Sequence, residues 1–180
     1  MPVEIDRAAL VEQIEVAFAD GRSTRERVKF LNHLPLASAQ TLPYEAQALE
    51  ALFRNRVWQT VAFEAREQLH ESDCAAELSD EALAYYLPAL LIMAVSDPSW
   101  LVNQENLERR LIASFGSVTQ RQQTVVLDFI EWMVAFYSFL ISEQDALDAD
   151  APLLDVEEVE YRLLMYLDEK RALAARWAQA

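Results

Sequence analysis

Glycine is almost absent from this chain, and its scarcity limits the possible folds more than any other feature. Only two glycines, Gly21 and Gly116, occur among the 180 residues. Tight β-turns and hairpins rely on glycine for backbone conformations with positive φ. Residues that favour helix, such as alanine, leucine and glutamate, are abundant instead. The sequence therefore predicts an all-α protein, and its 53% of hydrophobic residues predict a packed core rather than a disordered chain.

Capping residues and apolar spacing divide the chain into predicted helices. Ser23, Ser79 and Thr119 are candidate N-caps, while Gly21 and Asn55 are candidate helix ends. We expect a compact orthogonal helical bundle of about six or seven helices, followed by a C-terminal helix after an acidic linker. The predicted helices cover residues 5–19, 24–32, 43–54, 58–68, 79–95, 98–115, 119–140 and 156–178.

The C-terminal part of the chain changes in character. Eight acids and no base lie between Glu143 and Glu160, and Pro152 interrupts the segment. A charge run of this kind is typical of a solvated linker. We therefore predict three parts: a helical bundle over 1–142, an acidic linker over 143–155, and a helix over 156–180 that docks on its own bundle or swaps onto a second copy.

The net charge of −15 limits the possible partners. Nucleic acid and anionic membranes attract basic surfaces, so neither is expected as the main partner, whereas a basic protein fits.

The single cysteine, Cys74, allows no intrachain disulfide, and the N-terminus lacks the features of a signal peptide. The longest nearly uncharged apolar run, 82–95, is shorter than the roughly 20 residues that span a bilayer. We expect a cytoplasmic protein.

The most distinctive motif is Tyr85-Tyr86-Leu87-Pro88, inside the apolar helix predicted over 79–95. Pro88 cannot donate a hydrogen bond to the carbonyl of Ala84 and so bends the helix. Two interpretations follow. Tyr85, Tyr86 and Pro88 either line a ligand-binding pocket with a freed carbonyl and two phenols, or they form a packed bend, which is the more usual cause of such a motif.

Residues 78–91, Leu-Ser-Asp-Glu-Ala-Leu-Ala-Tyr-Tyr-Leu-Pro-Ala-Leu-Leu, resemble the core helix of a bacterial family of unknown function. The hallmark of that family is similar to Leu-Ser-x-Glu-Ala-x-x-Tyr-Tyr-Leu-Pro-Ala-x-Leu. Flanking pieces at 44–58 and 115–129 extend the resemblance over roughly residues 10 to 137. The acidic linker and last helix fall outside it, and Asn55 stands where the family favours glycine. The resemblance implies the helical architecture and no activity.

Four other groups of residues each have a functional and a structural interpretation. His70 and Cys74 suggest a nucleophile pair or a partial metal site, but a polar loop is the simpler reading. The aspartates of the linker lack the spacing of a calcium loop. The basic cluster Arg22, Arg25, Arg27 and Lys29 suggests phosphate binding or contact with the acidic linker, against an ordinary charged helix face. The aromatics Trp132, Phe136, Tyr137 and Phe139 suggest core, a ligand pocket or a subunit interface.

Recognisable catalytic motifs are missing. The chain has no glycine-rich phosphate loop, no H-E-x-x-H, no C-x-x-C and no G-x-S-x-G, so we assign no catalytic residue, metal or cofactor. Three hypotheses remain. The protein is an inhibitor-like binding module for a basic partner, a small-molecule-binding or enzymatic domain with its pocket near Tyr85, Tyr86 and Pro88, or a structural homo-oligomer. A homodimer is expected to use Trp132, Phe136 and Trp177.

Overall fold

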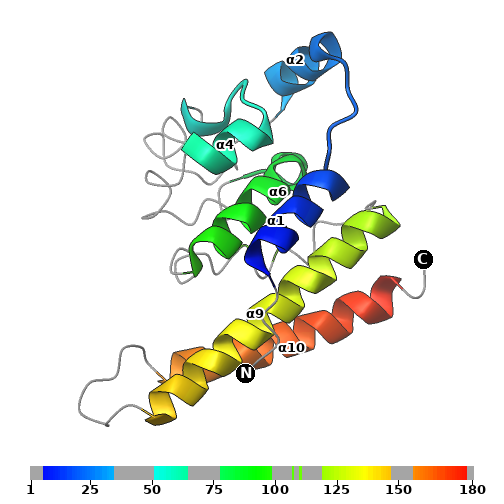
Figure 1. Cartoon of the computed structure of the whole chain (residues 1–180). Coiled ribbons are helices and arrows are strands. Elements are labelled where there is room, and N and C mark those ends of the chain that lie inside the picture. Colours follow the sequence, from blue (N-terminus) through cyan, green and yellow to red (C-terminus); the bar gives the residue numbers. More distant parts are fainter. Residues whose placement is uncertain are drawn as a thin grey trace. The chain divides into compact units, whose positions relative to one another are not determined.

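The computed structural model describes residues 6–34, 51–64, 78–98, 107, 110, 119–146 and 156–177. The all-α prediction is confirmed, since these residues form helices and turns and contain no β-strand. They group into two compact units, one of residues 1–10 with 118–180 and one of residues 11–117. The boundaries predicted at 142 and 155 stay a prediction. The helices are α1 Arg7–Ala17, α2 Thr24–His33, α4 Trp58–Glu64, α6 Asp80–Ser96, α9 Gln120–Ala146 and α10 Val156–Trp177 (Figure 1).

Side-chain caps start several helices where the sequence predicts them. The Ser23 and Glu26 side chains form a capping box at α2, and the Ser79 hydroxyl accepts from the Ala82 N–H, 3.1 Å away, at α6. Asn55 has a φ of 62°, the left-handed conformation predicted for it. The prediction for Gly21 is wrong. Helix α1 ends at Ala17, and Gly21 has no positive φ, because Asp20 rather than glycine shapes this turn.

In the unit of residues 11–117, α6 is the core helix and packs against α4. Its apolar residues predict burial on all sides, and twelve of its 17 residues are buried. Pro88 lies inside the helix, which continues through it to Ser96. From the start of α6, Asp80 and the carbonyl of Leu78 accept hydrogen bonds from the Arg110 guanidinium. This helix positions the predicted site, because Tyr85, Tyr86 and Pro88 all belong to it.

In the other unit, α9 and α10 form an antiparallel hairpin (Figure 1). Helix α9 runs to Ala146 rather than ending near Leu140 as predicted, whereas α10 begins at Val156 as predicted. A row of ring contacts joins the two helices and ends on Tyr137 and Tyr166, whose stacked rings are 5.6 Å apart. The row runs through Phe129, Trp132, Phe136, Tyr137 and Tyr166.

Helix α9 also has the length and composition of a membrane-spanning helix over Gln120–Ile141. It shares this property with core helices of soluble proteins. Asp128 and Glu131 lie near the middle of this stretch, where a bilayer strongly disfavours ionisable side chains. The absence of a membrane partner and the cytoplasmic location stay predictions.

Candidate functional site

The Tyr86 hydroxyl makes its hydrogen bonds within the fold. The side chain is fully buried, and its hydroxyl donates to the carbonyls of Phe53 and Arg56, at 2.6 and 3.0 Å. Its ring packs edge-on against Phe53, with 4.8 Å between centroids. Burial, followed by the neighbouring Tyr85, raises the pKa of Tyr86 well above its ordinary value, so it stays a neutral donor. Tyr86 therefore fixes the turn after Phe53 against α6.

Pro88 is buried within α6, one turn beyond Tyr85. Its side chain has no polar atom, and its only hydrogen-bonding group is the backbone carbonyl. The position therefore fits packing better than ligand binding. Of the three predicted site residues, only Tyr85 has a side-chain oxygen that makes no well-formed hydrogen bond with the described part of the chain.

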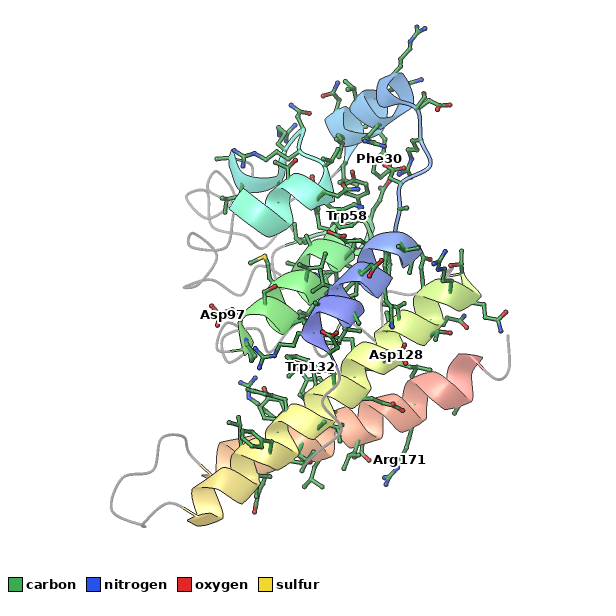
Figure 2. All side chains as sticks on the ribbon, in the orientation of Figure 1. Phe30, Trp58, Asp97, Asp128, Trp132 and Arg171 are labelled. Carbon is green, nitrogen blue, oxygen red and sulfur yellow. The ribbon has the colours of Figure 1, made fainter. Side chains whose placement is uncertain are left out.

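Tyr85 presents its hydroxyl to a different part of the unit. Its ring lies 5.1 Å from that of Phe30, on α2, and its hydroxyl lies near the backbone of Trp58, at the start of α4. Phe30 and Trp58 are labelled in Figure 2. The hydroxyl oxygen is buried, yet it has no hydrogen-bond partner of ordinary geometry among the described residues. Burial and then the nearby Asp20 carboxylate raise the pKa of Tyr85, while the Trp58 backbone N–H and two arginines oppose the rise. A buried phenol without a partner is costly and needs an explanation.

The group beside this phenol is an ion-pair cluster of Asp20, Arg22 and Arg27, called here the Asp20 cluster. The Asp20 side chain is only 6% exposed, and its two oxygens lie 3.3 Å from Arg22 Nη1 and Arg27 Nε. Asp20 also accepts from the Arg22 backbone N–H at 3.0 Å, which forms the turn between α1 and α2. Arg27 Nη2 donates to the carbonyls of Asp20 and Arg22, at 3.2 and 3.3 Å.

The Asp20 cluster carries one carboxylate against two guanidinium groups, and the neighbouring Glu26 carboxylate balances the second positive charge through its interaction with Arg22. Arg22 lies over the face of the Phe30 ring, 4.0 Å from its centroid, and 43% of its side chain is exposed. Stacking occupies the flat face of a guanidinium and leaves the N–H donors on its edge. The exposed edge of Arg22 therefore keeps donors that can bind an anionic oxygen, whereas the Tyr85 hydroxyl beside it is buried. Arg25 and Lys29, also in the predicted basic cluster, are exposed on α2.

Asp20 is the member of this group that sequence reasoning missed. The dipeptide Asp20-Gly21 is a turn signal, and an aspartate before a helix commonly accepts backbone N–H donors. That signal shows the turn but not the two arginines that close on it. The link from Asp20 to Tyr85 joins positions far apart in sequence and appears only after folding.

The other candidates divide into those the structure places and those outside the described residues. Trp132 is buried, stacks on Phe136 at 5.7 Å, and lies under the Arg7 guanidinium. That geometry fits a core position, while the Trp177 side chain is not among those described, so the predicted homodimer contact stays a prediction. His70, Cys74 and the aspartates of residues 148–155 lie outside the described residues. Among the residues that are described, no group of His, Cys, Asp or Glu is arranged to hold a metal ion.

The described residues form an all-α protein in which an ion-pair cluster, the Asp20 cluster, lies beside the buried hydroxyl of Tyr85. The chain belongs to DUF6714, a family of unknown function, which it matches over residues 6–158. The expected membership of a family of unknown function is confirmed; the bacterial origin of that family stays a prediction. The match includes the acidic segment and the start of α10, so the expectation that the acidic segment lies outside is wrong. No curated protein and no solved structure matches the chain.

Proposed function

We propose that this protein is a binding module for a basic protein partner, which docks at the acidic end of the α9–α10 hairpin. One observation carries the proposal. The hairpin is antiparallel, so the end of α9 and the start of α10 lie at the same end of it (Figure 1). Glu143 and Asp145 belong to the end of α9, and Glu157, Glu158 and Glu160 belong to the start of α10. The fold therefore brings the acidic end of α9 and the acidic start of α10 to the same end of the hairpin. No basic residue lies between Glu143 and Glu160 in the sequence.

An apolar anchor lies close to these acids. Phe139, two turns before the end of α9, is an aromatic side chain that is 42% exposed. Protein interfaces typically combine a desolvated aromatic centre with a charged rim that speeds association and selects the partner. The overall charge of −15 adds long-range attraction for a basic protein, and that attraction weakens as salt rises.

Site-specific photo-crosslinking in cells tests this proposal. A photoreactive phenylalanine analogue at Phe139 is compared with the same analogue at Val28, which is 53% exposed on α2 in the other unit. We expect position 139 to capture one basic protein that position 28 does not. Neutralising the acids at 143, 145, 157 and 158 to amides removes this product. Identical products at both positions, or a product unaffected by neutralisation, contradict the proposal.

A second function, binding of a small anion at the Asp20 cluster, is favoured by the unpartnered Tyr85 hydroxyl. The phenol donates to one ligand oxygen while the exposed edge of Arg22 pairs with the charge. Phosphate, sulfate and simple carboxylates are tested by thermal shift against the unmodified protein, Tyr85→Phe and Tyr86→Phe. A shift that Tyr85→Phe abolishes and Tyr86→Phe retains supports the site. The same shift in the Tyr85→Phe variant, or no shift with any of these anions, counts against it.

A further inference from the structure

Helix α10 exposes one continuous stripe of residues along its length. Tyr161 and Leu164 are 57% and 62% exposed, the highest values among the large hydrophobic residues described. Asp168 and Arg171 follow, with side chains that are 78% and 76% exposed, and then Ala175, which is also exposed. The positions 161, 164, 168, 171 and 175 repeat at intervals of three and four. This is the spacing of the a and d positions of a coiled coil.

The stripe lies on the side of α10 that faces away from α9. Tyr166 is fully buried and stacks on Tyr137 of α9. At 3.6 residues per turn, the five stripe positions point within about 40° of the direction opposite Tyr166. Figure 2 shows Arg171 pointing away from α9. Its own unit therefore leaves this coiled-coil stripe uncovered.

We propose that the stripe pairs with the stripe of a second copy of this chain, with the two α10 helices antiparallel. Charge selects this occupant and orientation. Within the stripe, Asp168 and Arg171 carry opposite charges, and both side chains are largely exposed. An antiparallel pair sets Asp168 of each copy against Arg171 of the other, whereas a parallel pair sets each of these residues against the same residue of the other copy and so places like charges together. The opposed helix dipoles favour the same arrangement.

The stripe also fixes the register of the pair. In an antiparallel coiled coil, each a position faces a d position of the other helix. Asp168 of one copy then faces Arg171 of the other, twice by symmetry, and Leu164 faces Ala175, so that a large side chain meets a small one. A shift by one heptad instead places Leu164 against Asp168, which buries a charge against an apolar group. Within one helix, Asp168 Oδ1 and Arg171 Nη1 form an ion pair at 3.1 Å. In the dimer, each of these side chains pairs instead with the opposite residue of the other copy.

None of the five stripe residues is among the acids of the proposed partner site. The antiparallel pair holds the two acidic hairpin ends at opposite ends of the dimer. The stripe lies beyond residue 158, where the family match ends, so the inference concerns this chain rather than its family. A pair formed by about four turns of helix is small for a protein interface, and we expect a dimer that depends on concentration.

Sedimentation of the full chain over a range of concentrations, with charge-reversal variants, tests the pairing. We expect the unmodified protein to dimerise, and Asp168→Arg and Arg171→Asp each to raise the dimer dissociation constant at least tenfold. Mixing those two variants restores dimers, because every 168–171 contact between them is again between opposite charges. The double variant D168R/R171D restores the homodimer for the same reason. Circular dichroism confirms that each variant is folded, as expected for exposed positions.

Several outcomes overturn the pairing. A protein that stays monomeric throughout the concentration range contradicts it, and so does a dimer that the single reversals leave intact. Dimers weakened by the single reversals but not restored by mixing or by the double variant exclude the antiparallel register. None of these outcomes affects crosslinking from Phe139, so failure here and failure of the proposed partner site are distinguishable.

Discussion

Helices α6 and α10 differ in how much of their surface is buried. Twelve of the 17 residues of α6 are buried, whereas among the described side chains of α10 only Arg162 and Tyr166 are. Packing around most of its surface determines where α6 lies, and its exposed residues are Asp80, Glu81, Ala84 and Ser96. Helix α10 is held through one side, around Tyr166, and keeps another side open. The contrast indicates that stability resides mainly in helices such as α6, and that contacts with other molecules are to be sought on the hairpin.

The largest expected effect comes from removing core volume from α6. Leu90 is fully buried, so Leu90→Ala should lower the free energy of unfolding by about 2–5 kcal/mol. The matched change Leu164→Ala on α10 removes the same atoms from a residue that is 62% exposed, and should change it by about 0.5 kcal/mol or less. Urea denaturation in dilute solution measures both. A similar loss in both variants would show that the outer side of α10 is packed within the single chain.

Two adjacent tyrosines sharpen the contrast within α6 itself. Tyr86→Phe removes the donor to the carbonyls of Phe53 and Arg56, which should cost about 1–3 kcal/mol. Tyr85→Phe removes a buried hydroxyl that has no partner of ordinary geometry, so its stability should be unchanged or slightly raised. Chemical denaturation of the two variants side by side gives the answer. A loss in Tyr85→Phe as large as that in Tyr86→Phe would mean that the Tyr85 hydroxyl is hydrogen-bonded in solution.

Helix ends give a smaller version of the same contrast. Ser79→Ala removes the side-chain cap of α6 and should cost about 1 kcal/mol. Asp168→Ala removes an exposed ion pair with Arg171 on α10 and should cost about 0.5 kcal/mol or less. Thermal unfolding in low and high salt separates them, because only the ion pair is screened. A cap variant that is as stable as the unmodified protein would show that other contacts, such as that of Arg110 with Asp80, fix the start of α6.

Local signals account for the parts of the fold that could be predicted. The caps at Ser23, Ser79 and Thr119 and the left-handed Asn55 depend on neighbours within a few residues, and all four are present in the structure. Burial of α6 on all sides follows from its composition. Gly21 was misassigned because glycine permits a left-handed helix end without requiring one.

The candidate site could be predicted only in part, because its chemistry depends on residues distant in sequence. The motif drew attention to Tyr85 and Tyr86, yet the Tyr86 hydroxyl bonds to carbonyls 30 and 33 positions earlier, and Tyr85 lies near Asp20, in the turn after α1. Arg162 is a further example. It is 4% exposed and lies one turn before Tyr166, on the buried side of α10, where a base is not expected from its residue type.

The smallest predicted effect concerns Asp128 on α9. It tests whether an unfavourable carboxylate in the hairpin lowers the stability of the fold. Partial burial and then the nearby Glu131 carboxylate raise the pKa of Asp128 above its ordinary value of 3.8. The folded chain therefore holds this proton more tightly than the unfolded chain. Stability is lost as the pH rises from the unfolded pKa through the folded pKa, and the penalty stays constant above it.

Asp128→Asn removes this penalty, so the variant should be more stable at neutral pH by about 0.5 kcal/mol or less. Its advantage should disappear at acid pH, below the unfolded pKa, where the native aspartate is also uncharged. In a Glu131→Gln background the gain should shrink, because one of the two causes of the raised pKa is gone. Urea denaturation of the four proteins across this pH range measures the effect. A gain that is equal at every pH would come from packing or helix propensity rather than from charge.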